Sequence, residues 1–163
     1  MLGNCNFITD PLGDLDADSN AVVGNGNNLE GDNNFVAGNG STVTASHSVA
    51  IGLNTTLGQA GTAIDQAVAI GASSTVMTSG GVAVGANASS TGDRATATGK
   101  DSTADGDRAT AIGGGARATS DHATALGGSS TAGGNGTASG FNAAANAFAS
   151  TADGAFASAA GQG

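Results

Sequence analysis

The chain has no tryptophan or tyrosine, five phenylalanines, one proline and one cysteine among 163 residues. Large side chains are therefore too scarce for a conventional core, which normally supplies most of the folding free energy. The single cysteine, Cys5, excludes an intrachain disulfide and a cysteine-based metal cluster. No apolar run has the length of a membrane span, and Met1 to Cys5 lack the features of a signal peptide. We expect no direct membrane insertion by this segment.

Basic residues are also scarce, because 4 Lys and Arg stand against 13 Asp and Glu and the net charge is −9. Nucleic acid and anionic membranes are therefore poor candidate partners. No Ser/His/Asp set or carboxylate pair is specified by spacing, and His47 and His122 have no metal-ligating residues at suitable intervals. The aspartates at 14, 16 and 18 lack the glycine and glutamate of a calcium loop. We expect no catalytic residues, cofactor or metal, and no enzyme.

What the chain does have is 29 glycines, many of them at a fixed period. The stretch Ser48 to Gly52, with the sequence Ser-Val-Ala-Ile-Gly, returns in similar form as Val68 to Gly71 and Val82 to Gly85. Seven of the nine intervals are 14 residues, and the exceptions are 19 and 13. Such a period predicts a repeat architecture. The anchor glycines, numbered here as position 5 of each coil, are Gly24, Gly38, Gly52, Gly71, Gly85, Gly99, Gly113, Gly127, Gly140 and Gly154.

Each coil contains two short extended segments, at positions 1–4 and about 8–11, separated by Gly/Asn turns. Positions 2 and 4 share one face of the first segment, and position 3 takes the other. A coil of this size has a perimeter of roughly 45 Å, enough for two strands with one thin layer of side chains between them. One face is left over. The alanines at position 3 invite other copies of the chain to cover it around a threefold axis, although the pattern leaves open which face points inward. The candidate core and trimer-packing residues are Ala50, Ile51, Ala69, Ile70, Ala83, Val84, Ala97, Ala111, Ile112, Ala125 and Leu126.

Two segments depart from the regular coil. Residues 1–19 are expected to form a cap or attachment segment, and residues 20–163 the coils, with a loop insertion near 58–66. The longest interval places five extra residues in an expelled loop. The candidate binding loop comprises Gly61, Thr62, Ala63, Ile64 and Asp65. The first coils are rich in asparagine, which tolerates left-handed turns and can form side-chain ladders.

At Ser48 to Gly52, Ala67 to Gly71 and Val82 to Gly85 the chain resembles the head repeats of trimeric autotransporter adhesins, the YadA-like heads of Gram-negative bacteria. The resemblance covers about residues 20–160. It implies a left-handed parallel β-roll of about ten 14-residue coils, assembled side by side as a homotrimer. It also implies an adhesive or spacer role at the bacterial cell surface, with collagen or other host matrix or cell-surface proteins as partners.

Two other functions fit the same repeats. Virion and phage tail fibres use similar trimeric repeats, and the N-terminal segment suits an attachment role. An ice-binding β-solenoid is the alternative of another class, because five successive coils carry threonine at position 2: Thr96, Thr110, Thr124, Thr137 and Thr151. Three charged pairs recur at coil ends: Asp93-Arg94, Asp107-Arg108 and Asp121-His122. They form either an interchain charge clamp or solvated turns of little energetic value.

Overall fold

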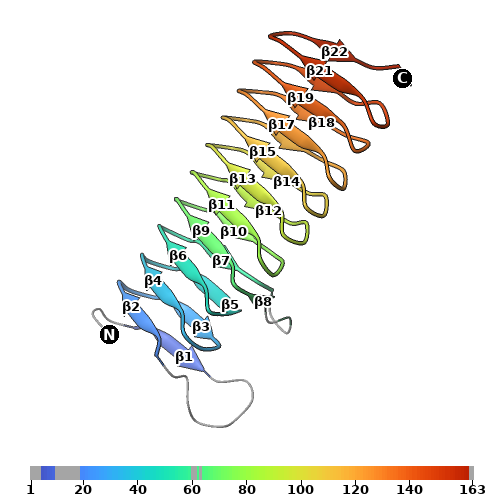
Figure 1. The fold of residues 1–163 in the computed structure, drawn as a ribbon. Helices are drawn as coiled ribbons and strands as arrows, with labels where there is room; N and C mark the ends of the chain where they lie inside the picture. The colour runs from blue at the N-terminus through green and yellow to red at the C-terminus, as the bar shows by residue number, and fades with distance from the viewer. Residues whose placement is uncertain (1–4, 10–18, 60–61, 63, 162–163) are drawn as a thin grey trace.

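The computed structural model describes residues 5–9, 19–59, 62 and 64–161. Figure 1 shows an elongated stack of coils that runs from β1 and β2 at one end to β21 and β22 at the other. Every pairing between strands of neighbouring coils is parallel, and no helix occurs in the described residues. The chain is therefore an all-β parallel β-solenoid of about ten turns, which confirms that part of the expected fold class.

Two sheets form the long sides of the stack. Sheet A holds positions 2 to 4 of each coil, in β2 (Ala21–Val23), β4 (Phe35–Ala37), β6 (Val49–Ile51), β9 (Val68–Ile70), β11 (Val82–Val84), β13 (Thr96–Thr98), β15 (Thr110–Ile112), β17 (Thr124–Leu126), β19 (Thr137–Ser139) and β21 (Thr151–Asp153). Sheet B holds the second segment, in β1 (Phe7–Thr9), β3 (Asn28–Glu30), β5 (Thr42–Ser46), β7 (Thr56–Leu57), β8 (Ile64–Asp65), β10 (Thr75–Val76), β12 (Ser89–Ser90), β14 (Thr103–Ala104), β16 (Arg117–Ala118), β18 (Thr131–Ala132), β20 (Ala144–Ala145) and β22 (Ser158–Ala159).

The register stacks the same position of successive coils. Ala83 pairs with Ala69 on one side and with Ala97 on the other. In sheet B, Val76 pairs with Leu57 and Ser90. Each position of the repeat therefore becomes a column that runs the length of the stack.

The core is a single layer between the two sheets, made mainly by the columns at positions 3 and 10, with alanines at positions 1 and 8 such as Ala95 and Ala116 beside them. At position 3, Val22 and Val36 give way to alanine from Ala50 onward, and all of these side chains are buried. At position 10, Leu29, Val43 and Leu57 are followed by smaller residues toward the C-terminus. A thin core of this kind needs no aromatic residue, which explains how the composition supports a folded chain.

The anchor glycine is required by both conformation and space. Gly85 has φ +137°, and a Cβ added there would lie 2.5 Å from the carbonyl oxygen of Gly99 in the next coil. Positive φ is strained for residues with a Cβ, and such a contact is far inside van der Waals distance. Because each coil repeats this geometry against the next, glycine recurs at position 5 along most of the chain.

Asparagine ladders hold the first coils together from the inside. The buried Asn34 side chain accepts a hydrogen bond from the backbone N–H of Ser48 at 3.0 Å and donates one to the Ala45 carbonyl at 2.6 Å. Asn27 makes the equivalent bonds to Ser41 and Gly38 at 3.0 and 2.9 Å. These buried amides are satisfied by backbone groups of the next coil, so they tie successive coils together.

The coils begin earlier than the sequence pattern predicted. Phe7 to Thr9 form β1 and pair with Asn28 to Glu30 in β3, within the segment expected to be a separate cap. Asn6 joins the asparagine ladder, because its Oδ1 accepts from the backbone N–H of Asn27 at 3.1 Å. The motif Gly3-Asn4-Cys5-Asn6 matches Gly24-Asn25-Gly26-Asn27 in sequence, a signal that the 14-residue period alone did not pick out. The aspartates at 14, 16 and 18 lie outside the described residues.

Candidate functional site

The outward side of sheet A is a long apolar surface of the described coils. It is made by positions 2 and 4, which alternate with the buried position 3. Val23, Phe35, Ile112 and Leu126 are 45%, 42%, 44% and 37% exposed. Between them lie the half-buried Val49, Ile51, Val68, Ile70, Val82 and Val84. Contiguous exposed apolar side chains of this kind mark an interaction surface on a folded chain.

The position-3 alanines lie elsewhere than the trimer hypothesis placed them. Ala50, Ala83 and Ala111 are 0% exposed because they sit between the two sheets of their own chain. They belong to the core half of the core and trimer-packing prediction, and they do not face a neighbouring copy. The other alanines of the set, Ala69, Ala97 and Ala125, are buried in the same way. Ile51, Ile70, Val84, Ile112 and Leu126 point outward and remain available to another chain.

The threonine ladder belongs to this same outward side. Thr96 pairs with Thr110, which pairs with Thr124, and the column continues through Thr137 to Thr151. It prolongs the column of Val49, Val68 and Val82 and runs beside Ile112 and Leu126 at position 4. The ladder is therefore part of a mixed apolar and hydroxyl face, and whatever covers the valines would also lie against the threonines.

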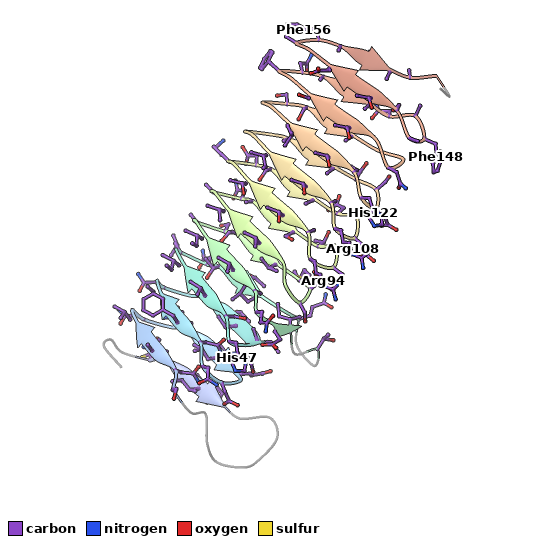
Figure 2. The ribbon with its side chains drawn as sticks, in the orientation of Figure 1. His47, Arg94, Arg108, His122, Phe148 and Phe156 are labelled. Carbon is purple, nitrogen blue, oxygen red and sulfur yellow. The ribbon has the colours of Figure 1, made fainter. Side chains whose placement is uncertain are left out.

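One turn edge of the stack, formed by positions 13 and 14, carries most of the charged pairs (Figure 2). The backbone N–H of Asp93 donates to the carboxylate of Asp107 at 3.0 Å, and that of Asp107 donates to Asp121 at the same distance. The partners of these carboxylates are backbone groups of the same chain. The aspartates of these pairs thus form an intrachain ladder, which accounts for their 14-residue recurrence. The interchain charge clamp stays a hypothesis.

Each histidine contacts a charged residue of an adjacent coil, and only the contact of His122 follows from the 14-residue spacing. His47 Nδ1 lies 3.0 Å from the Asp65 carboxylate, and His122 Nε2 lies 3.3 Å from Arg108 Nη1. Both contacts join adjacent coils. The contact between His47 and Asp65 could have been found by aligning the two coils across the five-residue insertion. Groups of three or more metal-ligating side chains are absent from the described part of the chain.

The insertion lies slightly earlier than the predicted loop. β5 pairs with β7 through Thr42 and Val43 and with β8 through Ala45 and Ser46, so the extra residues fall between these pairings, at 59–63. Ile64 is only 4% exposed and belongs to the core, and Asp65 lies in β8. Thr62 is exposed and bonds back to Gln59 at 2.9 Å. Gly61 and Ala63 lie outside the described residues. Ile64 and Asp65 therefore belong to the regular coil and not to the candidate loop.

The repeats match a known family. A model described as YadA head domain repeat (2 copies) matches residues 36–55, 79–102, 90–116 and 104–130. The first range runs from β4 to the turn before β7, and the other three together run from the turn before β11 to the turn before β18. The parallel solenoid agrees with them. The matched coils are YadA-like head repeats. A search among curated proteins found no match to the chain.

YadA-like heads form an adhesin-type family rather than an enzyme family, and they are homotrimeric in general. The matched repeats therefore suggest an adhesin-type head of the kind found on the bacterial cell surface. No helix in the described residues is long and apolar enough to cross a bilayer.

Proposed function

We propose that this chain is the head or spacer of a homotrimeric surface adhesin, in which three left-handed rolls lie side by side and repeated coils bind host matrix or cell-surface proteins. The outward side of sheet A carries the proposal. In one chain it leaves Ile112 and Leu126 open to water beside a column of valines and isoleucines. Covering such a surface is worth about 25 cal/mol per Å² of apolar area, which favours association.

Assembly is tested by light scattering coupled to size-exclusion chromatography. The expected mass is three times the 15.1 kDa of one chain. Val84→Glu places a charge in the middle of the outward face and is expected to yield monomers that keep their β-sheet circular dichroism. A monomeric wild-type protein at micromolar concentration, or a Val84→Glu variant with unchanged trimers, would contradict the proposal.

Adhesion is tested on the trimer with immobilised fibrillar collagen and with intact host cells. Repeated coils and threefold symmetry present the same short surface many times, so weak contacts gain strongly by avidity. We expect trimers to bind at least tenfold more tightly than monomeric Val84→Glu. Equal binding of monomer and trimer would contradict binding by avidity. If neither collagen nor host cells retain the trimer, adhesion is contradicted and the spacer role is favoured.

A virion fibre would use the same trimer, and neighbouring genes for tail assembly in place of an outer-membrane anchor would favour it. The ice-binding alternative needs the threonine face to be open to water, whereas the proposed trimer covers it. The two functions therefore compete for one surface.

A further inference from the structure

The two turn edges of the stack differ in charge. The charged turn edge, at positions 13 and 14, holds Asp93, Arg94, Asp107, Arg108 and their counterparts in other coils. The opposite edge, at positions 6 and 7, we call the neutral turn edge. Its position-6 residues are Asn25, Asn39, Leu53, Ala72, Ala86, Lys100, Gly114, Gly128, Phe141 and Ala155.

Large apolar side chains stand exposed on the neutral turn edge. Leu53, Phe141 and Phe156 are 53%, 57% and 67% exposed. The rings of Phe141 and Phe156 meet edge to face, with centroids 5.5 Å apart at 78°. Figure 2 places Phe156 on this edge, across the stack from Phe148 and the row of arginines and histidines. Aromatic enrichment is a mark of interface cores.

The ionised groups of this edge are already paired with each other. Lys100 Nζ lies 2.7 Å from Asp101 Oδ2, and the Asn87 amide donates to Asp101 Oδ1 at 2.9 Å. The hydrogen bond from Lys100 and then that from Asn87 lower the pKa of the Asp101 carboxyl. A neighbouring chain would therefore meet a surface with no net charge there. The other edge carries an excess of acid, because Asp32, Asp65, Asp93, Asp107 and Asp121 stand against Arg94 and Arg108.

A threefold assembly needs two different contact surfaces on each chain. In a threefold ring each contact is heterologous, so one patch of a chain meets a different patch of the next chain. The outward side of sheet A is the first patch. The second patch must also tolerate burial, and interface cores are depleted of charged residues. Position 6 is separated from the apolar position 4 only by the anchor glycine, so the neutral turn edge continues that face directly.

We infer that the neutral turn edge is the second interchain surface, with Leu53, Phe141 and Phe156 packing against a second copy of this chain. This inference rests on the proposed trimer. It also accounts for the last coils, where position 4 becomes Ser139 and Asp153 while Phe141 and Phe156 appear at the edge. Apolar contact shifts from the sheet to the edge as the sheet turns polar.

Exposed apolar side chains on the two opposite edges test the assignment. Phe141 and Phe148 flank β20 on opposite edges and are 57% and 69% exposed. The double variant Leu53→Glu/Phe141→Glu is expected to dissociate at a concentration at least tenfold higher than wild type, because it buries carboxylates between chains. Phe148→Glu is expected to match wild type. Equal dissociation of the double variant and Phe148→Glu overturns the inference.

Crosslinking provides a second measurement that does not depend on disrupting the trimer. In a Cys5→Ser background, chains with Ala86→Cys and differently tagged chains with Val84→Cys are assembled together and oxidised. We expect mixed-tag dimers from this pair and none when Ser79→Cys, on the charged turn edge, replaces Ala86→Cys. The reverse pattern overturns the edge assignment while the trimer stands, whereas a wild-type monomer in light scattering overturns the trimer itself.

Discussion

At the scale of single residues, the same side chain serves different ends according to its place in the coil. Asn34 is buried and bonds to the next coil, whereas its neighbour Asn33 is exposed with φ 56°. Asn39 stays at the surface, where its Oδ1 accepts from the backbone N–H of Asn25 at 2.8 Å. The asparagine-rich composition of the first coils thus supports both expected uses, ladders and left-handed turns.

Glycine offers the sharpest residue-scale prediction. We expect Gly85→Ala to destabilise the fold by about 1–3 kcal/mol from backbone strain alone, with a further cost from the contact with Gly99. Gly114→Ala is the control, because Gly114 has no positive φ and its nearest contact would be 3.8 Å away, at the Lys100 carbonyl. That substitution should be neutral or slightly stabilising. Urea unfolding followed by circular dichroism compares them, and equal midpoints would contradict the account of the repeat period.

At the scale of elements, strands of two or three residues are too short to be stable alone. Each inner strand is held by the equivalent strands of the coils above and below it and by packing against the facing sheet. The N-terminal coils fill this core with Val36, Leu29 and Val43, and the C-terminal coils with alanine. The asparagine ladders at the N-terminal end add hydrogen bonds where serine and alanine follow later in the same columns.

The ladder gives an element-scale prediction. Asn34→Ala removes the acceptor of the Ser48 N–H and the donor to the Ala45 carbonyl, so two buried backbone groups lose their partners. We expect the free energy of unfolding to fall by about 1–3 kcal/mol. Amide hydrogen exchange should accelerate relative to wild type at Ser48 more than at Ala97. Asn146→Ala, at an exposed position of the last coils, is the control. Unchanged exchange at Ser48 would show that the ladder does not support the stack.

At the scale of the whole molecule, function depends on what covers the outward side of sheet A. If three chains cover it, the threonine ladder is buried in the assembly. We therefore expect wild-type protein to show no thermal hysteresis or ice-crystal shaping at high concentration. Thr110→Lys is expected to weaken the trimer, whereas Thr103→Lys on the outer side of sheet B leaves it intact. Crystal shaping that is lost in Thr110→Lys would instead favour the ice-binding function.

The insertion allows a test of where adhesion resides. Deleting residues 59–63 restores the 14-residue interval, because it removes five residues from the 19 that separate Gly52 and Gly71. We expect the deletion variant to remain trimeric and to keep most of its binding to immobilised collagen, since contacts are spread over the coils. Loss of nearly all binding with the trimer intact would place the site in the loop.

The 14-residue period determined the coil, its two strands, the anchor glycine and the stacking of like positions. These follow from local chemistry, since glycine must recur where successive backbones approach closely. Tertiary structure decided which strand face points inward. Alternation tells which residues share a face but not which face is inside, and both were apolar or small. The narrow gap between sheets admits alanine at position 3 and turns Ile112 and Leu126 outward. Register between coils likewise placed Phe7–Thr9 in sheet B, Ile64 in the core and Asp65 beside His47.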